Sequence, residues 1–91
     1  MIREREIEAY FVEQCKLRGW LPLKFVSPGY TGVPDRIVIG WGWIAFVELK
    51  APGEKPTPRQ IRVHQKLMRH DVPVFILDSR EAVDQWVRGK K

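Results

Sequence analysis

Three charged residues, Asp35, Glu48 and Lys50, have side chains suited to metal-assisted hydrolysis. Paired carboxylates can hold a hard cation such as Mg²⁺, which prefers oxygen ligands and keeps several water molecules. A neighbouring lysine can position a bound water or stabilise a charged transition state. With the Leu49 carbonyl as a further oxygen ligand, these residues could form a hydrolytic metal site, provided that the fold brings them onto one face.

A hairpin would bring them together. The β-rich runs on either side of Trp41 and Gly42 predict two antiparallel strands joined by a two-residue turn. Pairing outward from that turn places Asp35 directly opposite Glu48, where like charges destabilise the strand pair and call for a cation. Lys50 shares a strand face with Glu48, because side chains two residues apart point the same way.

These three residues could also have a purely structural role. Asp35 could simply follow a turn made by Pro34, and Glu48 with Lys50 could form an exposed ion pair on one strand face. Against this, Glu48 interrupts the otherwise apolar run IAFVEL, where a solvent-facing charge would be expected to alternate earlier. Spacing alone leaves both interpretations open.

The elements that must position these residues can be read from the apolar pattern. Pro22 predicts an edge strand or the start of a strand, and the continuous apolar run 72–77 predicts a strand buried on both faces. Thr57 with Gln60, and Asp78 with Glu81, have the spacing of helix-start capping pairs. Helices are predicted over 3–18, 57–70 and from 78 onward, and strands over 20–26, 35–40, 43–50 and 72–77.

This order predicts an α/β fold, with residues 1–91 forming a single domain around a mixed four-stranded sheet flanked by helices, in the order αβββαβα. A helix between the last two strands permits a parallel, right-handed crossover. In the first helix the apolar positions Ile7, Tyr10, Phe11, Cys15 and Leu17 are expected to face inward. In the last helix, the residues expected to face inward are Ala82, Val83, Trp86 and Val87.

Composition narrows the class of protein. The chain of 91 residues has a net charge of +5, which favours polyanionic partners such as nucleic acid. Cys15 is the only cysteine, so we expect a small hydrophobic role for it, no intramolecular disulfide and a reducing environment. No run approaches the about 20 apolar residues of a membrane span, and we expect a cytoplasmic protein without a membrane partner.

The motif pair has a family resemblance. The run VPDRIVIG, followed by WIAFVELKAPG, resembles the two motif halves of the PD-(D/E)XK nuclease superfamily, with Pro34-Asp35 and Glu48-Leu49-Lys50 as the signature residues. More closely, GVPDRI, FVELKAPG and TPRQ resemble the VRR-NUC family, including its stand-alone, phage-type members. The resemblance extends from Glu4 to about Val83.

The resemblance implies a restriction-endonuclease-like domain that cuts DNA with Mg²⁺ or Mn²⁺ and needs no small-molecule cofactor. Stand-alone members are similar to Holliday-junction resolvases, which act as homodimers on branched DNA, whereas longer relatives act as flap or repair nucleases. Two other classes stay open, namely a DNA-binding domain without catalysis and a protein-interaction domain in which the three charged residues are an ion-pair cluster.

The superfamily also implies an acid from the first helix in the metal shell. Glu8 borders the apolar face of the predicted helix and is our prediction for this ligand. Glu4, one turn earlier, remains an alternative. Both could instead be acids favoured by the helix dipole near an N-terminus.

Gln60 matches the glutamine that the family carries in the helix after the motif, where it is implied to contact the active-site lysine or water. A capping box formed by Thr57 and Gln60 explains the same residue without catalysis. We expect the two roles to exclude each other in any one state of the protein.

Candidate DNA contacts surround the motif. The loop SPGYTGVP could bring backbone N–H groups to phosphates, and an exposed tyrosine in it could stack on a base. Basic residues at 59, 62, 66 and 69 fall on one helix face. A plain turn-rich loop and a solvated basic face are the alternatives. The predicted DNA-binding residues are Lys24, Ser27, Gly29, Tyr30, Arg36, Arg59 and Arg62.

The histidines and the large aromatic residues carry no clear motif. His64 and His70 lack a metal-ligand spacing, and we expect both at the surface or at a helix end. Trp43 and Phe46 are expected to pack on the sheet. Trp20 or Trp86 could serve a contact between two copies of the chain.

Overall fold

The computed structural model describes residues 1–90 and contains seven helices and strands in the predicted order. They are α1 (Glu4–Leu17), β1 (Leu21–Lys24), β2 (Arg36–Ile39), β3 (Ile44–Leu49), α2 (Pro58–Arg69), β4 (Val74–Leu77) and α3 (Arg80–Arg88). The predicted fold class, a mixed sheet flanked by helices in the order αβββαβα, is therefore confirmed.

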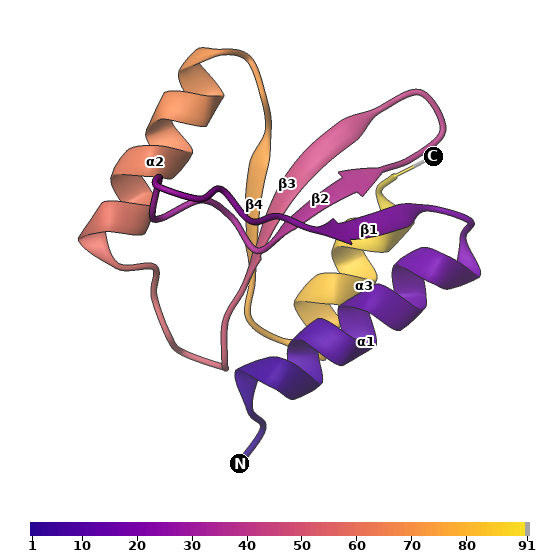
Figure 1. Ribbon diagram of the computed structural model, residues 1–91. Coiled ribbons are helices and arrows are strands. Elements are labelled where there is room, and N and C mark those ends of the chain that lie inside the picture. Colours follow the sequence, from indigo (N-terminus) through magenta and orange to yellow (C-terminus); the bar gives the residue numbers. More distant parts are fainter. Residues whose placement is uncertain (91) are drawn as a thin grey trace.

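The four strands lie in the order β1-β2-β3-β4 (Figure 1). The first three pair antiparallel, and β4 pairs parallel to β3 through a crossover that contains α2. β1 and β4 are therefore the two edge strands, and the prediction that Pro22 lies in an edge strand is correct.

The hairpin between β2 and β3 has the predicted register. Arg36 pairs with Val47 and Ile39 with Ile44. The Gly40 N–H donates to the Trp43 carbonyl at 2.9 Å across the turn. A side chain at Gly40 would place its Cβ only 2.1 Å from the Trp43 ring, so glycine is required at this position.

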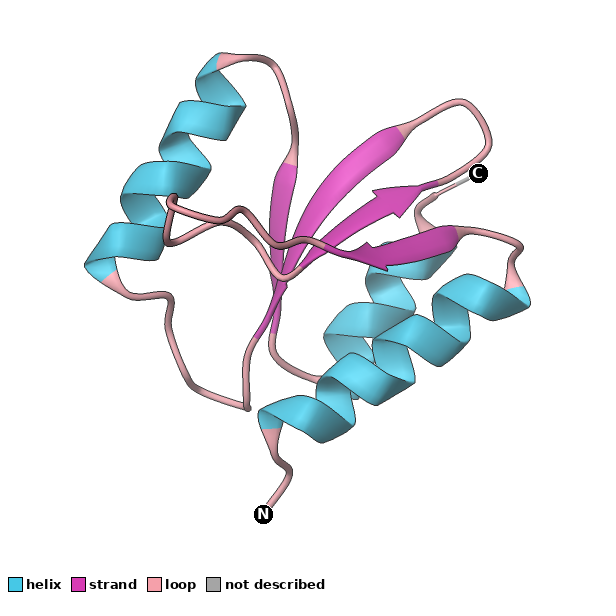
Figure 2. Cartoon of the chain, viewed as in Figure 1, coloured by secondary structure: helices cyan, strands magenta, loops and turns pink. Residues whose placement is uncertain are grey.

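Two helices cover one face of the sheet. α1 and α3 lie side by side against it, whereas α2 stands on the other side of the molecule beside β4 (Figures 1 and 2). The hydrophobic core lies between this face and the two helices. It includes Ile7, Phe11 and Cys15 from α1, Val38 and Val47 from the sheet, and Val83, Trp86 and Val87 from α3. Cys15 is buried and packs there as predicted.

Three tryptophans pack against one another in this core. The Trp20 ring meets Trp43 and Trp86 edge to face, at centroid distances of 4.9 and 6.0 Å. Trp43 packs on the sheet as predicted. The prediction that Trp20 or Trp86 serves a contact between copies is wrong, because both side chains are buried inside one chain.

Three further predictions need correction. The strand at 72–77 is not buried on both faces, because β4 is an edge strand on which Ile76 is 46% exposed. The Ser79 hydroxyl, not Asp78, caps α3 by accepting from the Ala82 N–H at 3.0 Å. Leu17 lies in the last turn of α1 and is 73% exposed, so it does not face inward.

Across residues 1–90, no helix is long and apolar enough to cross a bilayer.

Candidate active site

Asp35 lies in the bend between the buried Pro34 and the first residue of β2. Its backbone carbonyl accepts from the Phe25 N–H at 2.9 Å, and its side-chain Oδ2 accepts from the Leu49 N–H at 2.8 Å. The side chain therefore ties the end of β3 to the start of β2. Burial raises the pKa of Asp35, opposed by the hydrogen bond from Leu49.

Glu48 lies at the end of the same hairpin and is 1% exposed. Its Oε2 lies 3.4 Å from Lys50 Nζ and accepts from Gln60 Nε2 at 3.1 Å. Burial first and the charge of Asp35 second raise the pKa of Glu48 to about 7, against the lowering effect of Lys50. Two acids and one lysine therefore interact within a poorly solvated region.

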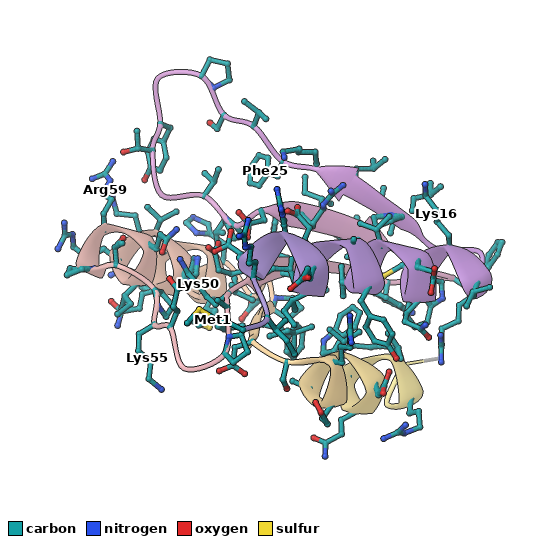
Figure 3. All side chains as sticks on the ribbon, turned by 90° about the horizontal axis from the view of Figure 1, so that it is seen from below. Met1, Lys16, Phe25, Lys50, Lys55 and Arg59 are labelled. Atoms are coloured by element: carbon teal, nitrogen blue, oxygen red, sulfur yellow. The ribbon has the colours of Figure 1, made fainter. Side chains whose placement is uncertain are left out.

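Lys50 is the third member of this group and is only 8% exposed. Figure 3 shows it between α2 and the start of α1. The alternative of an exposed Glu48–Lys50 ion pair is therefore wrong, since both partners are buried. A buried pair of this kind is costly to form, because both charged groups lose their hydration.

Gln60 does two things at once. Its Oε1 accepts from the Thr57 N–H at 2.9 Å, which completes the capping box of α2, while its Nε2 donates to Glu48 Oε2 at 3.1 Å. Our expectation that capping and an active-site contact exclude each other is wrong, because the amide uses a different atom for each. The cap fixes the side chain in the orientation that reaches Glu48.

His64 belongs to this group and was missed by the sequence analysis. It is 2% exposed, and its Nε2 lies 3.7 Å from Glu48 Oε1. Burial lowers the pKa of His64. The prediction of a surface residue is therefore wrong for His64, whereas His70 is exposed at the C-terminal end of α2 as predicted. The available signal was spacing, because His64 follows Gln60 by one helical turn.

The acids of α1 lie at the margin of the site. Glu8 Oε2 accepts from Arg36 Nε at 3.0 Å, so this carboxylate already has a cationic partner. Arg36 also donates to the Pro22 carbonyl at 2.9 Å, which occupies the guanidinium predicted to contact DNA. Burial and the charge of Asp35 raise the pKa of Glu4. Among residues 1–90, the side chain of Glu4 has no hydrogen bond or ion pair.

The ligands available for a metal ion are oxygens. No cluster of three or more His, Cys, Asp or Glu side chains within residues 1–90 has the geometry to hold a metal. Asp35 and Glu48 nevertheless supply two carboxylates, and Mg²⁺ is commonly held by one or two carboxylates with water completing its shell. The Oε1 atom of Glu48 is buried without a hydrogen-bond partner in the described chain, so it retains free lone pairs. This donor set fits a hard divalent cation.

The predicted DNA-binding residues separate into two groups. Lys24 and Arg62 are exposed, Gly29 is in an exposed turn and Ser27 is half-buried. The loop between β1 and β2 instead docks on α2 through Tyr30, whose hydroxyl accepts from Lys66 Nζ at 3.2 Å and whose ring lies 5.6 Å from the Arg59 guanidinium. Arg59 also donates to Thr31 Oγ1 at 3.2 Å. Loop and helix together form one basic surface next to the buried acids.

Comparisons with known proteins agree with this arrangement. No model of a known protein family matches the chain. A curated relative, "Putative nuclease p44" of Acyrthosiphon pisum secondary endosymbiont phage 1, is 50% identical over 82 residues, which span 89% of this chain and 88% of the relative. A solved structure described as a VRR_NUC domain superimposes with a TM-score of 0.90 at 30% identity, over the full length of both chains.

Proposed function

The chain belongs to the VRR-NUC family of nucleases, and on this premise we propose that it is a Mg²⁺- or Mn²⁺-dependent endonuclease for branched or otherwise structured DNA. The observation that carries the proposal is the group formed by half-buried Asp35 with buried Glu48 and Lys50. Two acids held close together in a dry region are unfavourable alone, and a divalent cation would relieve their repulsion.

Each residue has a distinct role in this proposal. Asp35, Glu48 and the Leu49 carbonyl would hold the cation. When bound, such a cation lowers the pKa of a coordinated water so that it can attack a phosphodiester. Lys50 orients the attacking water or stabilises the charge that develops on the phosphate. Gln60 holds Glu48 through the 3.1 Å hydrogen bond to Oε2.

A third carboxylate from α1 would complete the metal shell. Glu8 is our first candidate, although its use requires release from Arg36, to which it is bound at 3.0 Å. Glu4 has no such partner within the described chain. Mn²⁺ titrations of Glu8→Gln and Glu4→Gln distinguish them, because only the variant that removes a ligand weakens metal binding.

The basic surface beside the acids is proposed to bind the DNA backbone. Lys24, the loop residues Ser27, Gly29 and Tyr30, and the helix residues Arg59 and Arg62 would contact phosphates or sugars, and Tyr30 could stack on an unpaired base. Arg36 can join them only if it leaves Glu8. Cations of this kind make binding strongly dependent on salt.

A homodimer would give the enzyme two active sites for two strands. The sheet face that carries Glu48 also exposes Leu21, Leu23 and Ile44, at 53%, 48% and 54%. Leu21 and Ile44 both pair with Ile39 of β2, which lies between them on this face of the sheet. We propose that a second copy covers this apolar surface, because exposed apolar patches of this kind mark interaction sites.

The decisive experiment measures cleavage of labelled four-way junction, flap, fork and linear duplex DNA, with Mg²⁺ and with EDTA. We expect metal-dependent cutting, fastest on the junction, that falls by at least about 100-fold in Lys50→Ala. A chain that shifts the junction in a gel but never cuts it would be a DNA-binding domain. A chain without salt-sensitive DNA affinity would be neither a nuclease nor a DNA-binding domain, and this result would favour a protein-interaction domain.

A further inference from the structure

Two buried polar atoms face each other without a hydrogen bond next to the proposed metal ligands. They are His64 Nε2 and Glu48 Oε1, which lie 3.7 Å apart. Neither has a hydrogen-bond partner in the described chain, and the same holds for His64 Nδ1. Leaving a polar atom buried and unpaired costs about 1–3 kcal/mol. An imidazole in this position therefore calls for a partner.

Glu48 is held firmly at only one of its two oxygens. Oε2 takes Gln60 Nε2 at 3.1 Å and Lys50 Nζ at 3.4 Å, whereas Oε1 has no donor. The nitrogen that could donate to Oε1 is His64 Nε2. Its distance of 3.7 Å exceeds the range of N–H···O bonds, about 2.7–3.2 Å, by less than about 1 Å. Residues 60 and 64 are one turn apart in α2, so one helix presents donors to both oxygens.

We propose that His64 is a positioning residue, whose Nε2–H donates to Glu48 Oε1 and fixes this carboxylate for binding a divalent cation. This inference rests on the proposed function. A carboxylate offers about four lone-pair sites. Gln60 and Lys50 use two of them, His64 uses a third, and the fourth remains for the cation. The Nε2 atom can carry this proton in either protonation state of the ring.

The test uses two substitutions of His64 that differ in one respect. In His64→Gln the amide nitrogen occupies nearly the place of Nε2 and keeps the donor, whereas His64→Leu fills the site without one. Isothermal titration of the metal-free protein with Mn²⁺ gives the affinity directly. We expect His64→Leu to weaken Mn²⁺ binding by about 10- to 100-fold, the range seen when a group supporting a metal ligand is lost. His64→Gln should restore most of it.

Two controls keep the result interpretable. His70→Leu changes an exposed histidine of the same helix and should leave Mn²⁺ affinity unchanged. If His64→Leu fails to fold, as judged by circular dichroism, His64→Asn replaces it, because its shorter amide mimics Nδ1 and cannot donate from the Nε2 position.

Three outcomes would overturn the inference. Wild-type Mn²⁺ affinity in His64→Leu would show that Glu48 needs no donor at Oε1, and equal losses in the Gln and Leu variants would exclude hydrogen bonding as the cause. In both cases the proposed nuclease activity would still stand. Failure of the wild-type chain itself to bind Mn²⁺ would instead overturn the metal-dependent function and the role of His64 together.

Discussion

Glu48 combines almost complete burial with an acidic neighbour and a single cationic one. Burial and the charge of Asp35 outweigh the attraction to Lys50, so that the pKa of Glu48 rises to about 7. At neutral pH this carboxyl exchanges its proton readily. A metal that binds there has to displace that proton, because only the carboxylate is a ligand.

Metal affinity is therefore predicted to depend on pH. Below pH 7 the protein holds the Glu48 proton, so the apparent Mn²⁺ affinity should rise about tenfold per pH unit up to about 7 and then level off. Titration calorimetry at pH 5.5, 6.5, 7.5 and 8.5 measures this. An affinity that is already constant between pH 5.5 and 6.5 would contradict the raised pKa.

Asp35→Asn is predicted to separate stability from catalysis. At pH 8 the change removes a negative charge that opposes ionised Glu48, and the amide oxygen can still accept from the Leu49 N–H. We expect the metal-free protein to gain roughly 1 kcal/mol, or about 4–8 °C in Tm, while cutting is abolished. Differential scanning calorimetry in EDTA measures the gain.

The control for this prediction is Asp71→Asn, which alters an exposed aspartate with a positive φ that asparagine also tolerates. It should change Tm little. Asp35→Ala is a poorer test than Asp35→Asn, because it would leave the buried Leu49 N–H unpaired and destabilise the hairpin. A lower Tm in Asp35→Asn would mean that the charge repulsion is negligible.

The residues of the motif could be predicted because strand alternation and one tight turn fix their positions. Lys50 shares a face with Glu48 by period alone, and the turn residue Gly42, with φ of 89°, sets the register that brings Asp35 close. The pairing of Glu8 with Arg36 could not be predicted, since it depends on how α1 crosses the sheet. His64 was missed because it lacks a metal-ligand spacing along the sequence, and its burial depends on how α2 packs beside the end of β3.

At the scale of the element, the start of α2 is coupled to the site. The Thr57 hydroxyl accepts from the Gln60 N–H at 3.1 Å, and the Gln60 side chain spans the cap and Glu48. The helix therefore begins where its first turn can contact the end of β3. A change in the cap and a change in the site contact should have different consequences.

Thr57→Ala and Gln60→Ala are predicted to share a loss of stability but to differ in catalysis. Each removes part of the capping box and should cost about 1 kcal/mol. Only Gln60→Ala also removes the hydrogen bond to Glu48 Oε2, so the cutting rate of this variant should fall by about tenfold or more. Thr57→Ala should cut at the normal rate. Chemical denaturation and single-turnover cleavage measure the two effects. Equal cutting by both variants would leave Gln60 with capping alone.

Local patterns located the elements but not their neighbours. The apolar run at β4 indicated a strand, yet its place at the sheet edge depends on the crossover and leaves Ile76 uncovered. The start of α3 was misassigned by one residue, because Asp78 and Ser79 are both good caps and only the backbone geometry selects Ser79.

At the scale of the whole molecule, the sheet divides the protein into two sides with different tasks. The side under α1 and α3 carries the three-tryptophan core and stabilises the fold. The other side carries the buried acids beside α2, and beyond them the exposed apolar residues of β1 and β3. A second copy that covered those residues would lie next to the active site.

The homodimer is testable at one position on this surface. Leu23→Lys places a charge on the exposed apolar strand β1 and should convert a dimer into a monomer, because burying an unpaired charge in an apolar interface is costly. Leu17→Lys is the matched control, since Leu17 is an exposed leucine on α1, which packs on the opposite, core face of the sheet. Size-exclusion chromatography with light scattering gives the masses, and junction cleavage shows whether one or both strands are cut. The proposed assembly would be contradicted if the wild-type protein stayed monomeric at about 100 micromolar, a concentration well above the dissociation constants of stable dimers. Dissociation caused by Leu17→Lys alone would instead place the interface on the helical side of the molecule.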